Sequence, residues 1–334
     1  MALARVRMGG RPLPHALLIQ VEHLTHSDET AFERQEVQGS DIDALWQDLG
    51  RAAGSVEIGL CRIRFEPGRR PTPAHDHGAE EEIFYVLAGS GLSWRDGDTH
   101  DVRAGDCLVY RPDEGAHTLI AGDEALDVLA FGERRPAELA HLPRAGVLWA
   151  GPAWVDDAVA AGHPWQREVK AGRLPLPKEV SPRPAWIVHR DAVSGRELDR
   201  SGRRAVFRRL GAAAGARTTG LNHIAIAAGL LGAPRHCHGA EEELFVILAG
   251  AGTLRVGDEE APVRAGHVVS RPAGTGLAHS FRAGPDGLEY LAYGQHEPND
   301  IIYYPDSGKV ALPGVGVIMR VEQVDYWDGE DEPA

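Results

Sequence analysis

The sequence predicts an all-β protein with two similar domains, and three observations lead to this prediction. The chain has 334 residues, of which 40 are glycine and 22 are proline, and it is 43% hydrophobic. Short apolar runs such as 83–87 and 244–248 are separated by turn signals such as Asp96-Gly97, a spacing typical of a β-sandwich or β-barrel. A long part of the chain also occurs twice, and its length suits two domains that each bury a core.

The repeat is clearest in a 17-residue segment that begins at His75 and returns at His236, 161 residues later. Twelve of its 17 positions are identical in the two copies. Other landmarks keep nearly the same offset, namely Gly54 and Gly215, Gly59 and Gly220, 102–105 and 263–266, Arg111 and Arg271, and His117 and His279. Two copies predict a duplicated domain rather than a solenoid, which needs at least three repeats.

The repeat divides the chain into five parts. They are an N-terminal extension (1–45), a first domain (46–145), a linker (146–184), a second domain (185–325) and a tail (326–334). Prolines at 152, 164, 175 and 177 predict that the linker is an extended connector. Inside each copy the pattern is strand, turn, strand, with no amphipathic helix of more than a few turns.

The apolar runs 83–87 and 244–248 carry no polar residue on either face. A strand that is solvated on one side would alternate polar and apolar residues. We therefore expect both strands to be covered on both faces, either by the other domain or by a second subunit. A homodimer is accordingly one expectation for the assembly.

Composition excludes several classes of partner. The net charge of −14 disfavours nucleic acid, which requires basic patches. The three cysteines form no CxxC pair, which argues against a disulfide framework. The apolar segment 17–19 is too short for a signal sequence, and the chain has no apolar run long enough to span a membrane. These features predict a cytoplasmic protein that acts on a small molecule.

The repeated residues predict two metal centres. Residues i and i+2 of a strand project to one face, so each His-x-His pair can point inward together. A glutamate follows each pair, and a third histidine comes later in each copy, on what would be a neighbouring strand. The predicted ligands are His75, His77, Glu82 and His117 in the first copy, and His236, His238, Glu243 and His279 in the second.

Three imidazoles and a carboxylate suit a divalent transition metal, namely Mn, Fe(II), Ni, Co or Zn, with up to two ions per chain. An ion that prefers six ligands would keep open positions for a substrate or dioxygen. A single His-x-His is weak evidence, but the whole ligand set occurs twice in register. We expect the acids flanking the ligands to be solvated or to lie beside the ligands; they are Glu80, Glu81, Glu241 and Glu242.

These spacings resemble the two motifs of the cupin superfamily, HxHx4Ex6G and GDx5Px4H. The residues that carry the resemblance are His75, His77, Glu82, Gly89, Gly105, Asp106, Pro112 and His117, and then His236, His238, Glu243, Gly250, Gly266, Pro272 and His279. In the second copy His267 replaces the usual Asp, and two residues are added before the last ligand. The resemblance implies a bicupin of two jelly-roll (double-stranded β-helix) barrels, each with a metal site in its mouth.

The resemblance does not select a reaction, because cupins include dioxygenases, oxalate decarboxylases, isomerases, hydrolases and binding proteins. Oxalate decarboxylases usually carry Trp after the ligand Glu, whereas this chain has Ile83 and Leu244. Gentisate-type dioxygenases typically lack that Glu. We expect a metal-dependent enzyme of the oxygenase type acting on a small organic molecule. The alternatives are a metal-dependent lyase, isomerase or hydrolase, and a binding protein without turnover; no residue is assigned a catalytic role.

Weaker signals concern the pockets. Arg111 and Arg271 either bind a substrate carboxylate bidentately or pair with a protein acid. Cys61 and its counterpart Asn222 either line the pockets or pack, and packing is favoured. The loop before His117 carries two acids (113–114), whereas the loop 272–278 is uncharged and longer. We therefore favour the second domain as the site of an anionic or apolar substrate.

Overall fold

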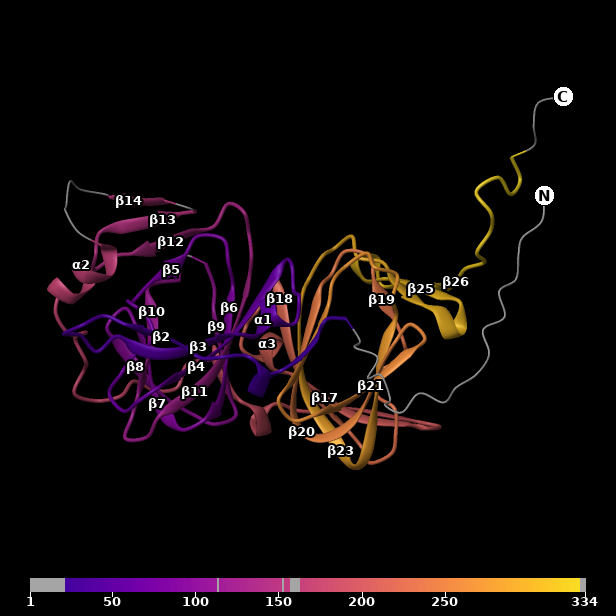
Figure 1. Cartoon of the computed structure of the whole chain (residues 1–334), viewed down its shortest axis with the longest axis horizontal. Helices are drawn as coiled ribbons and strands as arrows, with labels where there is room; N and C mark the ends of the chain where they lie inside the picture. Colours follow the sequence, from indigo (N-terminus) through magenta and orange to yellow (C-terminus); the bar gives the residue numbers. More distant parts are fainter. Residues whose placement is uncertain (1–21, 113, 152, 157–162, 331–334) are drawn as a thin grey trace, which may run out of the picture.

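The computed structural model describes residues 22–112, 114–151, 153–156 and 163–330. Figure 1 shows two β-barrels side by side, the first in indigo and magenta and the second in orange and yellow. The helices are α1 (Leu49–Ala52), α2 (Pro164–Lys170) and α3 (Leu210–Ala213), with 3-10 turns at Ser27–Glu29, Arg190–Ala192, Pro305–Ser307 and Pro313–Val315. Almost all other regular structure is antiparallel strand, and the predicted all-β fold of two jelly-roll barrels is confirmed.

The first barrel is formed by a seven-stranded and a three-stranded sheet. The larger sheet has the order β15 (Ile187–His189), β9 (Asp106–Tyr110), β6 (Glu82–Ala88), β11 (Leu126–Glu133), β4 (Ile58–Phe65), β3 (Asp43–Asp48), β2 (Glu33–Glu36). The smaller sheet has the order β10 (His117–Ala121), β7 (Ser90–Arg95), β8 (Asp98–Arg103).

The second barrel repeats this arrangement with longer strands. Its main sheet has the order β1 (Leu24–His26), β22 (His267–Arg271), β20 (Glu243–Val256), β23 (His279–Gln295), β18 (Thr219–Ile226), β17 (Arg203–Arg209), β16 (Arg196–Arg200), and β21 (Glu259–Arg264) also pairs with β20. The long strands β20 and β23 correspond to β6 with β7 and to β10 with β11, and register shifts in β20 mark where they bend. One continuous sheet of the second barrel therefore takes the place of the seven-stranded and three-stranded sheets of the first.

The barrels exchange one strand each, which the sequence did not reveal. β1 lies in the predicted N-terminal extension but pairs with β22 of the second barrel, and β15 lies at the start of the predicted second domain but pairs with β9 of the first barrel. A histidine ends each exchanged strand and contacts a carbonyl oxygen of the opposite barrel. The Nε2 of His26 lies 3.0 Å from the oxygen of Ala265, and the Nε2 of His189 lies 3.1 Å from that of Ala104.

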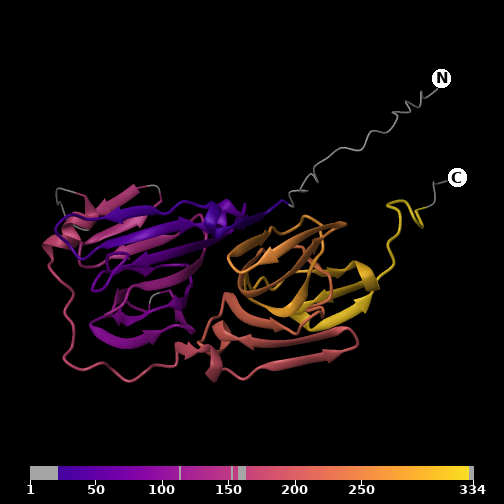
Figure 2. The same cartoon turned by 60° about the horizontal axis from the view of Figure 1, so that its bottom comes forward.

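The segment between the repeats is not the extended connector that the sequence predicts. It continues a four-stranded sheet of β14 (Ala153–Asp156), β13 (Val147–Ala150), β12 (Leu139–Leu142) and β5 (Asp76–His77), followed by α2. The buried Glu168 of α2 pairs with Arg144 and Arg70, which locks the helix onto the first barrel. Among the described residues of this segment, the chain after α2 runs extended under the first barrel toward the second (Figure 2). The second barrel has a matching sheet of β19 (Cys237–His238), β24 (Ile302–Tyr304), β25 (Lys309–Leu312) and β26 (Val317–Arg320).

The strands β6 and β20 are covered on both faces, as predicted from their apolar runs. Tyr85 and Ile247 are each 2% exposed. Ile83, Tyr85, Leu244 and Val246 belong to one apolar cluster shared by the two barrels. The partner barrel supplies the cover, so this observation no longer requires a second subunit.

Two buried glutamates reinforce this interface and correct the expectation that they are solvated or lie beside the ligands. Glu81 is 1% exposed, and its carboxylate accepts hydrogen bonds from the backbone of Arg217 and Thr219 and from the Thr219 hydroxyl. Glu242 is 0% exposed and accepts from the backbone N–H groups of residues 56–58 and from the hydroxyl of Ser270. Each carboxylate therefore clamps a backbone segment of the opposite barrel.

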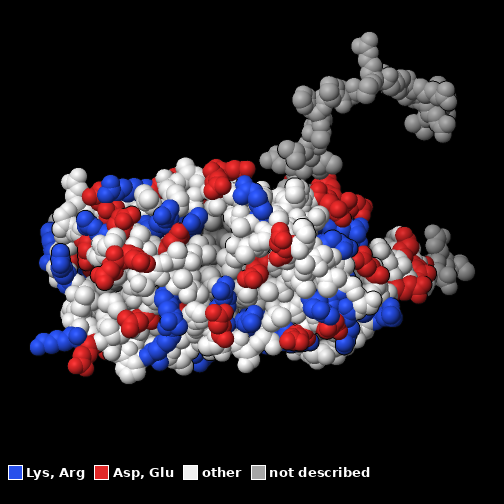
Figure 3. Space-filling view, turned by 90° about the horizontal axis from the view of Figure 1, so that it is seen from below, with Lys and Arg blue, Asp and Glu red and all other residues white. Residues whose placement is uncertain are grey.

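Charges of both signs mingle on one face of the molecule (Figure 3). On the face drawn in Figure 3, acidic and basic side chains are interspersed over both barrels. A mixed surface differs from the one-signed basic patch that nucleic-acid binding requires. Within the described residues, no helix is long and apolar enough to cross a membrane.

Candidate metal centres

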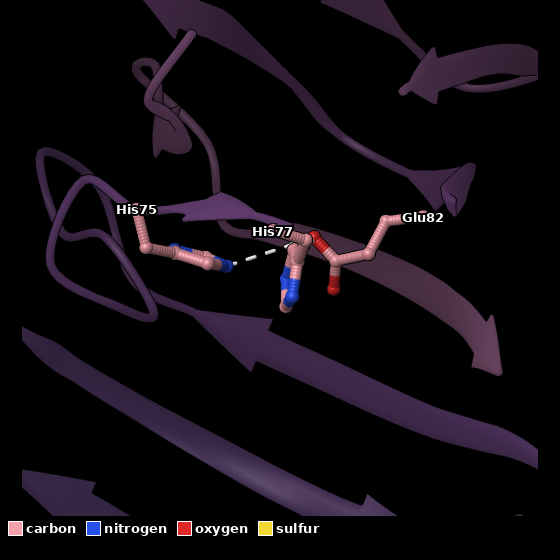
Figure 4. A group of neighbouring side chains, drawn as sticks. All are labelled: His75, His77 and Glu82. Carbon is pink, nitrogen blue, oxygen red and sulfur yellow. Dashed lines mark ion pairs between the residues drawn. The ribbon is translucent and has the colours of Figure 1, made fainter. Parts of the chain in front are cut away.

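The first candidate centre forms where three short stretches of the first barrel meet. His77 lies in β5, Glu82 begins β6, His117 begins β10, and His75 bridges to His117 through its backbone. The Nε2 atoms of His75, His77 and His117 lie 3.6, 3.3 and 2.9 Å from Oε2 of Glu82. Figure 4 shows His75, His77 and Glu82 pointing toward one another. The structure thus brings the four predicted ligands together.

The second candidate centre repeats this geometry. His238 lies in β19, Glu243 begins β20, His279 begins β23, and His236 bridges to His279. The Nε2 atoms of His236, His238 and His279 lie 3.9, 3.4 and 3.2 Å from Oε2 of Glu243. All eight predicted ligands therefore fall into two clusters of four.

These clusters fit a metal ion. Ligand atoms about 2.1 Å from a common ion and at right angles to each other lie about 3 Å apart. The distances to the glutamate oxygen range from 2.9 to 3.9 Å, close to that spacing. The Nε2 atoms of His77, His238 and His279 are buried without a hydrogen-bond partner. Buried polar atoms rarely stay unpaired, and a bound cation would satisfy these three.

Protonation in the centres also suits ligation. Burial lowers the pKa of both His117 and His279 to about 4, so these imidazoles are neutral at pH 7. Burial alone would raise the pKa of Glu243, but the imidazole of His279, 3.2 Å away, and the charge of His238 hold it well below its usual range. The carboxylates around His77 outweigh burial and raise its pKa to about 11, so a metal would have to displace its proton.

A carboxylate outside each cluster orients one ligand, and the search for ligands from the sequence missed both. Nδ1 of His77 lies 3.2 Å from Oε1 of Glu138, and Nδ1 of His238 lies 2.7 Å from Oδ2 of Asp300. Such a contact keeps the proton on Nδ1 and turns Nε2 toward the metal. The signal was present, since Glu138 and Asp300 hold the third position in the matching segments 136–145 and 298–307.

The first centre opens into a largely apolar cavity of about 310 Å³. Its lining includes Trp46, Ile63, Phe84 and Cys61 as well as the ligands. Cys61 therefore lines the pocket and also packs against the apolar core of the first barrel, so the favoured packing role is found together with the alternative. Burial raises the pKa of its thiol to about 12, so it is neutral at pH 7.

The two arginines singled out by the sequence are not equivalent. Glu82 pairs with Tyr110 across β6 and β9, and Glu243 pairs with Arg271 across β20 and β22. Arg271 therefore occupies the position of Tyr110, whose ring stacks on His117 at 3.8 Å. Arg111 instead pairs with Glu114 near the surface.

The structure also changes the argument that two acids before His117 make the first barrel less suited to an anionic substrate. Glu114 binds both Arg111 and Arg95, so its charge is compensated. Asp113 lies outside the described residues. In the second barrel, the ring of Tyr304 stacks on that of His236, with centroids 5.8 Å apart.

Comparison with known proteins gives three kinds of similarity. The profile of the family described as "Cupin domain" (Cupin_2) matches residues 61–132 and 222–291. The dimethylsulfoniopropionate lyase DddW of Ruegeria pomeroyi is 34% identical over 115 residues, which are 34% of this chain and 68% of that protein.

Two solved structures share the two-barrel arrangement. The oxalate decarboxylase of Lactobacillus farciminis in its formate complex has a TM-score of 0.55 and 14% identity, over 82% of this chain and 86% of that one. The oxalate decarboxylase of Bacillus subtilis at pH 4.6 has a TM-score of 0.52 and 15% identity, over 81% and 75%. At this identity the likeness establishes the fold alone.

Proposed function

The chain belongs to the cupin superfamily and carries two cupin domains, and from this premise we propose that it is a metal-dependent lyase acting on a small organic molecule. The observation that carries the proposal is the convergence of a complete His₃Glu set in each barrel, with one histidine of each set held by an outer carboxylate. We also propose the eight ligands named above, the division of the chain into five parts, a cytoplasmic location and a homodimer.

A divalent ion in such a site supplies Lewis-acid chemistry, because it polarises a bound oxygen and stabilises negative charge on it. The residues of the chain prepare for that role. Glu138 and Asp300 accept from Nδ1 of His77 and His238, so the Nε2 of each faces the centre and can bind a metal that displaces its proton. Apolar walls such as Phe84 and Trp46 limit the access of water to the first centre.

A lyase is preferred to an oxygenase because the curated relative DddW is a lyase that shares 34% identity over two thirds of its length. The oxygenase expected from the sequence remains the second candidate. It is favoured by the four-ligand set, which leaves positions open on a six-coordinate ion. Either reaction would use the same eight ligands.

The test begins with the metal content of the full chain purified without added metal. The proposal requires up to two transition-metal ions per chain, lost on ligand substitution. The metal-loaded protein is then incubated with small organic acids with and without dioxygen, and the products are followed by NMR. A lyase forms product under both conditions without oxygen uptake. Product formation that depends on oxygen would replace the lyase by the oxygenase, and protein that binds no metal would refute both.

A further inference from the structure

The second barrel has a buried arginine, Arg271, beside its candidate metal centre, where the first barrel has Tyr110. Arg271 is 4% exposed. Its direction follows from strand alternation, because Val269 packs in the interior of the second barrel and Val268 packs in the interface. Residues two apart in a strand share a face, so Arg271 points inward with Val269. Its directly paired partner across the strands is the ligand Glu243, which also shares its face.

The guanidinium of Arg271 has few hydrogen-bond partners. In the part of the chain that the structure describes, the hydrogen bond of its side chain runs from Nη2 to the carbonyl oxygen of Leu277, at 3.3 Å. Its Nε is buried with no partner. No carboxylate of the described residues lies within 4.0 Å of it, whereas Arg111 pairs with Glu114. A buried cation without an acid is costly to maintain, and a bound anion would offset that cost.

The two centres therefore differ in charge. A divalent ion with one ionised glutamate and neutral imidazoles leaves one net positive charge in either barrel. Arg271 adds a second positive charge in the second barrel, whereas Tyr110 at the same position of the first is neutral and hydrogen-bonds to Ser93. The outer carboxylates Glu138 and Asp300 occur on both sides and cancel in the comparison.

We propose that Arg271 is an anion-binding residue and that the second barrel takes a substrate bearing a carboxylate. A carboxylate can accept from Nε and a terminal nitrogen of Arg271 in the bidentate geometry that guanidinium favours. The loop 272–278 that leads to His279 carries no acid to repel such an anion. The inference rests on the proposed function, because the carboxylate shares the barrel with the metal centre.

The test uses the full chain carrying His77→Ala, so that the signal comes from the second barrel, loaded with Mn²⁺. Acetate is titrated in, and its displacement of water from the ion is followed by water-proton relaxation; acetamide is the neutral probe of the same shape. Arg271→Gln and Arg271→Tyr, which introduces the residue of the first barrel, should each weaken acetate binding about tenfold or more. Acetamide binding and Mn²⁺ content should not change.

The matched control is Arg111→Gln, which removes the arginine that already has an acid partner and should leave acetate binding unchanged. Acetate binding at the wild-type level in both Arg271 variants would overturn the inference while leaving the proposed function intact. Loss of Mn²⁺ from both variants would also overturn it, because Arg271 would then support the metal centre and not the anion. A parent protein that binds neither Mn²⁺ nor any other divalent transition metal would refute the proposed function itself.

Discussion

The two barrels hold the same ligands in the same geometry but differ in what surrounds them. The first centre opens into an apolar cavity where Tyr110 stacks on a ligand, and the second places Arg271 at that position. Duplication has kept the four candidate ligands and changed the residue next to them. Ligand identity therefore does not tell which barrel turns over a substrate, and the neighbouring residues are the better guide.

The largest expected effect separates the barrels by activity. His77→Ala and His238→Ala should each remove one metal ion per chain, as measured by elemental analysis. Because we place the substrate in the second barrel, only His238→Ala should lower turnover. The loss should exceed the roughly 100-fold that is typical when a residue hydrogen-bonded to a metal ligand is replaced. Equal losses in the two variants, or a loss confined to His77→Ala, would contradict the assignment.

The next effect concerns the outer carboxylates. Glu138→Gln and Asp300→Asn should weaken metal binding in their own barrel by about 10- to 100-fold, measured by competition with a chelator. Asp300→Asn should have the larger effect, since Asp300 is 1% exposed and lies 2.7 Å from its histidine, against 3.2 Å for Glu138. Asp76→Asn is the control, because Asp76 precedes His77 on the strand and contacts His141 instead. If Asp76→Asn weakened metal binding equally, the loss of a negative charge near the centre would explain the effect, and the contact with the ligand histidine would not.

The clamps between the barrels offer a comparison of stability. Glu242 accepts hydrogen bonds from three backbone N–H groups and one hydroxyl. Glu81 accepts them from two backbone N–H groups and one hydroxyl. Replacing either by Gln turns an acceptor into a donor against buried N–H groups, so the free energy of unfolding should fall by about 2 kcal/mol, and more for Glu242. Chemical denaturation measures this, with exposed Glu66→Gln as the neutral control. Unchanged stability would show that the apolar cluster alone joins the barrels.

The sequence predicted what the repeat carries and missed what depends on contacts between distant segments. The clustering of the eight candidate ligands followed from residue types recurring at fixed spacing, and the covered strands followed from apolar runs without alternation. The equivalence of Arg111 and Arg271 was wrong because Arg271 follows Gly266 by five residues and Arg111 follows Gly105 by six, so the two arginines stand one position apart on equivalent strands. A one-residue shift moves a side chain to the other face. Glu81, Glu242 and the exchanged strands act across the interface, and no local pattern marks such contacts.

The smallest expected effect tests the strand exchange through its two histidines. Each accepts at Nδ1 from a backbone N–H two residues on, Asp28 for His26 and Asp191 for His189. That contact leaves the proton on Nε2, which donates to the carbonyl oxygen of the opposite barrel. The two histidines differ in burial, since His26 is 4% exposed and His189 is half-buried. His26→Ala should therefore lower the free energy of unfolding by about 1 kcal/mol, whereas His189→Ala should lower it by less, because water replaces the lost partner. Chemical denaturation of both variants measures the difference, and a larger loss for His189→Ala would mean that β15, rather than β1, is the more important of the two exchanged strands.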